Sequence, residues 1–329
     1  MHSAPPLQTP DHSSASTPSA GPAAAGPQRD VTWPAVTAIA WREVVRFLRQ
    51  RNRVVAAVAT PLVFWLLLGF GLNEPFRAVG PELGGDPGGE PGAVAVGSEV
   101  GVGLSASSGS GVNTSGGSGG SGGGVGYLEY FFPGMVVMVV LFTSIFSTIS
   151  VIDDRNNGFL QGVLASPAKR WAIVLGKVLG GALIATLHGL VLLPLWCVFF
   201  HWPGLGGLGA AVAVMFVTSV GLTALGLWFA WPMDSTSGYH AVMNLVQFPM
   251  WFLCGAVFPL ATAGALKWVM LANPLTYGHA TLASALSGRF TVDLGVGGVP
   301  WAAGLGVVLV ASVAMVTLAT QRACAVRGD

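Results

Sequence analysis

The stretch that decides the fold reads IDDRNNGFLQGVLASPAKRWAIVLGK, residues 152–177. It is the only strongly polar, charged segment in the apolar two-thirds of the chain. One apolar run ends beside it near residue 151, and another begins at residue 171. This position predicts a short aqueous segment between two membrane-crossing helices.

The pattern inside this stretch predicts a helix over residues 153–166. Asp153 and Asp154 stand where a helix N-terminus favours negative charge, and Ser166-Pro167 would end the helix. Apolar residues recur between them at helical spacing, namely Phe159, Leu160, Val163 and Leu164. Water offers such a stripe nothing to pack against, so we expect a protein partner to cover it.

Composition places the whole chain in a membrane. About half of the residues are apolar (52%) and only 9% are charged, too few to cover a soluble globule of 329 residues. A net charge of +1 argues against a nucleic-acid partner, which would need a clustered basic face. The three cysteines and six histidines follow no metal-ligand spacing, so we expect no metal site.

The N-terminal segments differ sharply in composition. Residues 1–30 are rich in Pro, Ala and Ser, which predicts a disordered cytoplasmic tail. Residues 31–53 predict an amphipathic helix lying in the membrane interface, with arginines towards water and anionic lipid headgroups and Trp41 on the other side. The arginines of its narrow polar arc are Arg42, Arg46, Arg49 and Arg53. The alternative is the solvated face of a soluble helix.

Apolar runs then predict a domain of six membrane spans over residues 54–322. The expected spans cover residues 54–72, a run from 127 to about 151, 171–200, 208–231, 240–260 and 301–320. Residues 73–126 read as a flexible external loop rich in Gly and Ser, and residues 323–329 as a short tail. Basic residues cluster at 42–53, 155–177 and 322–327, which predicts both termini in the cytoplasm. The fold class is an all-α polytopic membrane protein.

A few polar side chains fall inside the predicted spans. They are Thr143, Ser147, His188, Asn244 and Gln247. Each has two interpretations. The hydroxyls can serve close helix packing or form part of a polar pathway, and the amides can line a cavity or join helices. His188 can be a neutral imidazole that is hydrogen-bonded across helices, or it can contact substrate or a proton. Lys177 lies near the inner end of its span, where it can snorkel to water.

Motifs for catalysis are missing from the sequence. No GxxxxGK[ST] phosphate loop, HExxH helix or Ser/His catalytic set occurs, so we expect no catalytic residues, no bound cofactor and no ATP hydrolysis by this chain. What remains is a membrane body that rearranges when another protein supplies energy.

Several motifs resemble the type-2 ABC exporter permeases, in particular the daunorubicin-resistance and nodulation-factor group. They are D-R-x-x-G-F-L-x-x-x-L-A-S-P with K-R-W-x-I-V-L-G-K, Y-x-x-Y-F-F-P-G, F-P-M-W-F-L-C-G-A-V-F-P-L and K-W-V-M-L-A-N-P-L-T-Y. The resemblance implies that the first motif is a cytoplasmic coupling helix that docks on a separate ATPase subunit carrying ATP and Mg²⁺. It also implies two permease copies, or this chain with a paralogue, and short outer helices over residues 267–277.

The expected ATPase contacts combine apolar anchors with charges that set register. They are Asp154, Arg155, Gly158, Phe159, Leu160, Val163, Leu164, Ser166 and Pro167. The function that follows is outward transport of an amphiphilic or lipophilic substrate (a drug, lipid or glycan-like molecule) in a bacterial plasma (inner) membrane. The alternatives are a membrane anchor or sensor that recruits a cytoplasmic regulator, and an enzyme that acts on lipid.

Overall fold

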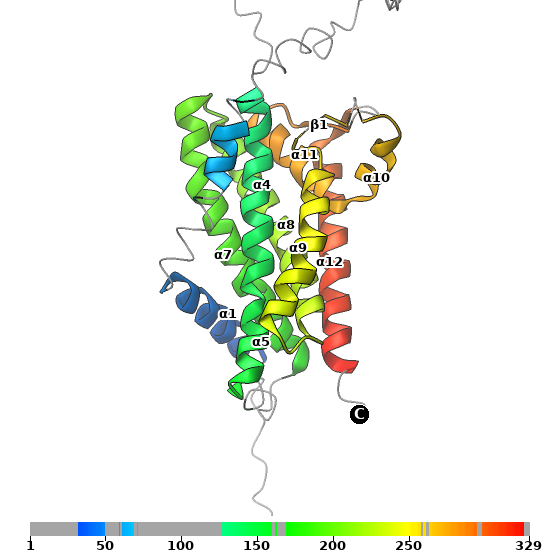
Figure 1. The fold of residues 1–329 in the computed structure, drawn as a ribbon. Coiled ribbons are helices and arrows are strands. Elements are labelled where there is room, and N and C mark those ends of the chain that lie inside the picture. The colour runs from blue at the N-terminus through cyan, green and yellow to red at the C-terminus, as the bar shows by residue number, and fades with distance from the viewer. Residues whose placement is uncertain are drawn as a thin grey trace, which may run out of the picture.

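The computed structural model describes residues 32–49, 59, 61–68, 71, 127–159, 162, 169–257, 259–260, 263–294 and 298–325. Within these residues the chain forms a bundle of long helices (Figure 1). They are α4 (Tyr127–Ser147), α7 (Arg170–Phe199), α8 (Gly204–Ala230), α9 (Thr236–Phe252) and α12 (Trp301–Ala325). The shorter α1 (Thr32–Leu48) lies beside α7 at one end of the bundle, and α5 (Ile149–Asn156) continues α4 there. We call this end the inner end, because the predicted cytoplasmic basic residues gather at it.

The structure confirms an all-α polytopic membrane protein. Among the described residues, four helices are long and apolar enough to cross a membrane: α4 with α5 as one rod (Tyr127–Asn156), α7, α8 and α12. They match the second, third, fourth and sixth predicted spans within a few residues. Of the first predicted span the structure describes residues 59, 61–68 and 71, with gaps between them, so the six-span count stays a prediction. The predicted tails and the Gly/Ser-rich loop also lie outside the described residues, apart from Ala323–Ala325 at the end of α12.

The chain changes ends between Arg46 and Trp65, as a first crossing requires. Arg46 contacts α5 at the inner end. Trp65, by contrast, packs edge-on against Phe132 and Phe200 and donates from Nε1 to the Leu128 carbonyl at 3.1 Å, at the opposite, outer end. Helix α1 and the helical residues 61–68, which fall inside the predicted first span, therefore lie at opposite ends of the bundle.

The fifth predicted span differs from the structure. We expected residues 240–260, but α9 starts at Thr236 and ends at Phe252. Seventeen residues at 1.5 Å each extend roughly 26 Å, less than the ~30 Å hydrocarbon core. The chain then turns through Gly255, whose φ of +86° suits glycine.

Short elements cover the outer end, close to the position that the sequence predicted. They are η3 (Gly264–Leu266), α10 (Lys267–Ala272) and α11 (Pro274–Leu286). Asn273 caps α11, because its Oδ1 accepts from the Leu275 amide at 3.0 Å and Pro274 fills the first helical position. Strands β1 (Thr291–Asp293) and β2 (Gly298–Pro300) pair antiparallel beside it, a hairpin that the sequence analysis did not predict.

Helix α4 forms the centre of the bundle. It is apolar on every side, and Phe131, Phe132, Leu141 and Ile145 are fully buried. A helix that is hydrophobic all round needs neighbours all round, and α7, α8, α9 and α11 supply them. The outward faces of α7 and α12 instead expose aliphatic side chains, as lipid-facing helices do: Leu183, Leu187, Val191, Val310 and Val313.

A break at Thr148 separates α4 from α5. Its Oγ1 lies 2.6 Å from both the Ile145 carbonyl and the Tyr239 hydroxyl. Tyr239, on α9, is fully buried, and its hydroxyl also reaches the carbonyls of Ile145 and Gly226 at 3.2 Å. The hydroxyl of Tyr239 therefore links the break between α4 and α5 to both α8 and α9.

Candidate functional site at the inner junction

Helix α1 lies directly on α7 because two glycines leave room for it. A Cβ at Gly176 would lie 3.0 Å from the Val36 carbonyl, and one at Gly180 would lie 3.1 Å from the Ala40 carbonyl. Glycines four residues apart line one face of a helix, the small-residue pattern that lets helices approach closely in membranes. This contact brings Glu43 of α1 against Lys177 of α7.

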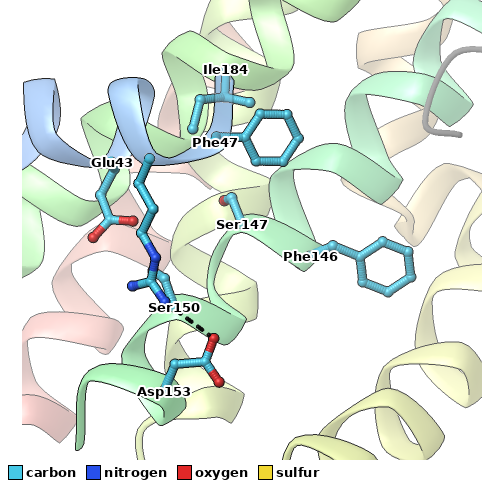
Figure 2. A pocket seen from close by; sticks show the side chains of 8 residues that line it. Glu43, Phe47, Phe146, Ser147, Ser150, Asp153 and Ile184 are labelled. Carbon is cyan, nitrogen blue, oxygen red and sulfur yellow. Dashed lines mark hydrogen bonds and ion pairs between the residues drawn. The ribbon is translucent and has the colours of Figure 1, made fainter. Parts of the chain in front are cut away.

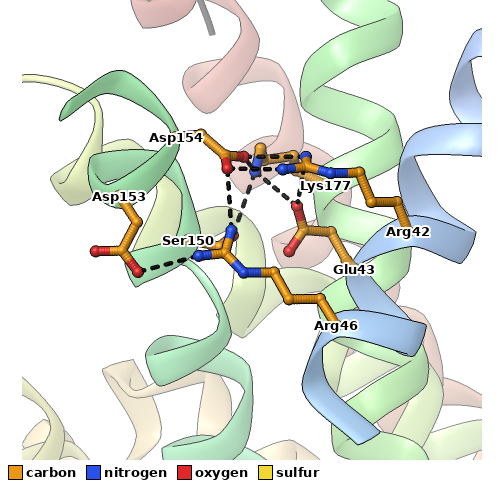
Figure 3. Close-up of polar contacts among 7 residues, drawn as sticks. All are labelled: Arg42, Glu43, Arg46, Ser150, Asp153, Asp154 and Lys177. Carbon is orange, nitrogen blue, oxygen red and sulfur yellow. Dashed lines mark hydrogen bonds and ion pairs between the residues drawn. The ribbon is translucent and has the colours of Figure 1, made fainter. Parts of the chain in front are cut away.

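Lys177 is buried with all of its donors satisfied. Its Nζ lies 2.5 Å from Asp154 Oδ2, 2.8 Å from Glu43 Oε1 and 3.2 Å from Ser150 Oγ (Figure 3). The side chain is 5% exposed. The expectation that Lys177 snorkels to water is therefore wrong: it turns into the protein, where two carboxylates compensate its charge.

Asp154 is the hub of the cluster. Arg42 donates to it twice, at 2.9 Å to Oδ1 and 3.2 Å to Oδ2, and Arg46 Nη1 donates to Oδ1 at 3.0 Å. Arg46 also reaches Asp153 Oδ2 at 3.4 Å. The hydrogen bond to Asp154 holds the pKa of Arg42 above its usual value. We call the six charged residues the inner charge network: Arg42, Glu43, Arg46, Asp153, Asp154 and Lys177.

The network overturns two predictions. Asp153 and Asp154 do not begin a helix; they lie in the last turns of α5, where the helix dipole disfavours anions. Nearby cations compensate for this placement. Arg42 and Arg46 were expected to face water and headgroups, yet they point at these carboxylates. Arg49 is exposed as expected, and Arg53 lies outside the described residues.

The exposed side of α1 is apolar in part. Trp41 is 70% exposed, and Trp33 and Leu48 are exposed as well. Trp33 packs edge-on against Trp171 at the start of α7. Exposed aromatic rings beside a charged helix face are typical of a membrane interface, so the orientation predicted for Trp41 is compatible with the structure.

The inner end of α5 is also tied to the turn between α8 and α9. Arg155 Nη1 donates to Asp234 Oδ1 at 3.1 Å, and its Nη2 donates to the Trp231 carbonyl. Asn156 Nδ2 donates to the Asp234 carbonyl at 3.3 Å. Arg155 therefore donates to acceptors within the chain, and Asp154 accepts from cations within the chain. The contact of both residues with an ATPase subunit stays a prediction.

The chain leaves α5 through a glycine turn. Gly158 has φ +73° directly after the helix, the left-handed position that ends many helices. Phe159 follows, 42% exposed, with the Arg42 guanidinium 3.7 Å from its ring centroid. The remaining predicted contacts lie outside the described residues: Leu160, Val163, Leu164, Ser166 and Pro167.

The polar residues predicted to share a pathway make different contacts. Gln247 and Asn244 do share a face, and Gln247 Nε2 donates to Asn244 Oδ1 at 3.0 Å. Ser147 instead donates to the Ser144 carbonyl of its own helix, and Thr143 is buried within α4. The ring of His188 packs edge-on on Phe47 of α1, at 5.3 Å.

A small pocket lies beside the network, between α1, α4, α5 and α7. Glu43, Phe47, Ser147, Ser150 and Asp153 are among the residues that line it (Figure 2). Its volume of about 20 Å³ is enough for one water molecule but not for a substrate. Among the described residues, the inner junction is therefore a closely packed joint between helices with room for about one water molecule.

The sequence analysis did not predict the ion pair between Glu43 and Lys177. A signal was present: Glu43 is an isolated acid on a helix of arginines, and Lys177 is an isolated base in an apolar run. A charge at membrane depth needs an opposite charge nearby. Matching the two, and adding Asp154, would have predicted the contact between α1, α5 and α7.

The fold and this joint define a polytopic helical membrane protein with a charged inner junction, and comparison with known proteins gives its family. The model of the ABC-2 type transporter family matches residues 34–286. The chain therefore belongs to the ABC-2 type transporter family and is a membrane permease component of an ABC transporter.

Two relatives carry names of the same kind. A Cyanophora paradoxa protein named transport permease ycf38 is 26% identical over 155 residues, covering 46% of this chain and 53% of that protein. An Escherichia coli K12 protein named multidrug ABC transporter permease YbhR is 23% identical over 156 residues, covering 46% of this chain and 42% of that protein. The matched region thus spans about half the length of these relatives.

Proposed function

We propose that this chain is the permease subunit of an ABC exporter and that it moves an amphiphilic or lipophilic substrate outward. A separate ATPase subunit, with bound ATP and Mg²⁺, supplies the energy. Family membership supports the permease role, and the relative named for multidrug transport supports a lipophilic cargo. The proposal places the chain in a bacterial plasma membrane, with a second permease copy or a paralogue beside it.

The observation that carries the proposal is the joint at the inner end of α5. The central rod of α4 and α5 ends there, and ion pairs join it to α1 and α7 while Arg155 joins it to the α8–α9 turn. A displacement applied just after Gly158 would move these elements together. The segment that follows is the one predicted to dock on the ATPase, with Phe159, Leu160 and Leu164 as apolar anchors.

Reconstitution with the ATPase subunit tests the docking role. Co-purification of the two subunits, and ATPase activity in vesicles that depends on this chain, are the expected results. Leu164→Asp should abolish the stimulation while membrane insertion stays intact, because a carboxylate would be forced against an apolar cleft. At the first anchor, Phe159→Ala is the cleaner test of the apolar contact. In Phe159→Asp, the nearby Arg42 would form a new ion pair with the aspartate.

Two outcomes would contradict the proposal. If both variants keep full stimulation, the segment after Gly158 is not the docking element. If the ATPase neither binds this chain nor responds to it, the alternative of a membrane anchor or sensor that recruits a cytoplasmic regulator gains support. Transport or resistance profiling of cells that express both subunits would then identify the class of cargo.

A further inference from the structure

Two arginines hold the inner end of α12, and one of them comes from another helix. Helix α12 ends at Ala325, at the inner end of the bundle (Figure 1). Arg170, the first residue of α7, donates from Nη1 to the Ala323 carbonyl at 3.1 Å. The guanidinium of Arg322, on α12 itself, lies 4.1 Å from the ring centroid of Trp228 on α8. The last turn of α12 therefore contacts both α7 and α8.

The bond from Arg170 satisfies a carbonyl at the end of a neighbouring helix. Ala323 carries one of the last four carbonyls of α12, which have no partner within a regular helix. Ala323 is 1% exposed, so its carbonyl has almost no access to water. A helix dipole favours a cation at its C-terminus and disfavours one at its N-terminus, where Arg170 stands on α7. The position of Arg170 is therefore stabilised by α12 and not by its own helix.

Apolar packing joins the same helix ends. A second cluster of buried side chains lies at the inner end and takes members from α5, α7, α8 and α12. Its members include Val151, Ile173, Val174, Leu227 and Ala319. Ala323 belongs to this cluster as well, so the bond from Arg170 lies beside it. Within the described residues, Arg170 adds a polar contact to the apolar one between the inner ends of α7 and α12.

Arg170 stands just beyond the segment predicted to dock on the ATPase. We call residues 158–167, which hold most of the predicted ATPase contacts, the docking segment. The inner charge network lies at its first end and joins α5 to α1 and α7. After its second end the chain enters α7 at Arg170, with Lys169 as the N-cap. The two ends of the docking segment thus lead to different helices: the first to α1 and α7, the second to α12.

We propose that Arg170 is a positioning residue that links the second end of the docking segment to α12. A displacement of this end moves the start of α7, and the bond to the Ala323 carbonyl carries the inner end of α12 with it. The sixth predicted span then responds to the ATPase together with the helices that the inner charge network joins. The inference rests on the proposed function, because it takes the docking segment as the place where the ATPase acts.

Hydrogen exchange of the purified full-length chain in lipid nanodiscs, without any ATPase, tests the contact first. Arg170→Gln removes the guanidinium, and the amides in the last two turns of α12 should exchange about fivefold to tenfold faster. Lys169→Gln removes the neighbouring cation, whose exposed side chain has no partner among the described residues, so it should leave this exchange unchanged. Exchange within α4 should be the same in both variants, as evidence of an intact fold.

The same measurement in the presence of the ATPase subunit tests the positioning role. In the wild-type chain and in Lys169→Gln, a non-hydrolysable ATP analogue should change the exchange at the inner ends of α1, α5 and α12. Arg170→Gln should lose the change in α12 alone, while the ATPase still co-purifies and α1 and α5 still respond. Arg170→Lys keeps a cationic donor and should restore part of the response of α12. A residue that only stabilised the fold would alter the response of all three helices.

Two results would overturn the inference while the proposed function stands. One is exchange at the end of α12 that Arg170→Gln leaves unchanged in the chain alone. The other is an α12 that ignores the nucleotide in the wild-type complex, or that responds equally in Arg170→Gln. If Arg170→Gln fails to fold, the comparison of Arg170→Lys with Lys169→Gln decides by the same criteria. Failure of the proposed function is a separate result, in which the ATPase does not bind the chain, and the inference then fails with it.

Discussion

Lys177 and Asp154 are 23 positions apart in the chain, yet Nζ and Oδ2 lie 2.5 Å apart inside the protein. The intervening residues include the segment predicted to dock on the ATPase. The ion pair therefore closes the base of this segment and holds its two ends, α5 and α7, together. A force on the segment would act on both helices at once.

Replacing Asp154 should destabilise the protein far more than replacing Asp153. Asp154→Asn leaves the cations of Arg42 and Lys177 facing a neutral amide in a buried site, and breaking such a network costs about 3–5 kcal/mol. Asp153 is 31% exposed with one 3.4 Å contact, so Asp153→Asn should cost about 0–1 kcal/mol. Thermal denaturation of the purified variants in detergent measures the difference. Equal midpoints would contradict the central role of Asp154.

Glu43 and Lys177 should be energetically coupled. Lys177→Met removes the ammonium between two carboxylates, and Glu43→Gln removes one of those carboxylates. The double variant should therefore be less destabilised than the sum of the single ones, by about 0.5–3 kcal/mol. A double-mutant cycle on the free energy of unfolding measures this coupling, and strict additivity would mean that the pair contributes no interaction.

The contact of α1 with α7 should be sensitive to side-chain size at Gly180. A Cβ there would lie 2.9 Å from Glu43 Cβ and 3.1 Å from the Ala40 carbonyl, so Gly180→Val should push α1 away and disrupt the inner charge network. Gly306→Val on α12 is the matched control, because a Cβ at that position meets nothing within 4 Å. The yield of disulfide cross-linking between cysteines engineered on α1 and α7 should fall in Gly180→Val and stay unchanged in Gly306→Val.

The hydroxyl of Tyr239 should stabilise the break in the central rod. Tyr239→Phe removes its contacts with Thr148 and with the Gly226 carbonyl, and should cost about 1–3 kcal/mol because these groups stay buried. Tyr277→Phe is the control, since that hydroxyl makes one bond, to the Leu271 carbonyl, on a half-buried side chain. Equal thermal stability of the two variants would argue against a special role for Tyr239.

The sequence predicted the long helices well because hydrophobic length is a local property. The third predicted span, 171–200, agrees with α7 within one residue at each end. The prediction for α9 was poorer, because the apolar run continues past Phe252 while the glycine turn at Gly255 ends the helix early. Apolar composition alone cannot distinguish a span from an apolar turn that other elements bury.

The inner junction was harder to predict, since its charges come from three distant segments. Helical spacing placed Arg42 and Arg46 correctly on one face, but it could not say what the face contacts. The two aspartates suggested a helix start, whereas they end one, and cations from α1 and α7 make this tolerable. A tertiary contact thus overrode a local preference.

The charges of the inner charge network determine how the membrane potential acts on it. Its members are three cations and three anions, so the cluster carries no net charge. Moving one elementary charge across 100 mV involves about 2.3 kcal/mol, but a neutral group moved as a unit involves none. A joint built this way can shift within the bilayer without doing work against the electric field, and the voltage across the membrane exerts no net force on it.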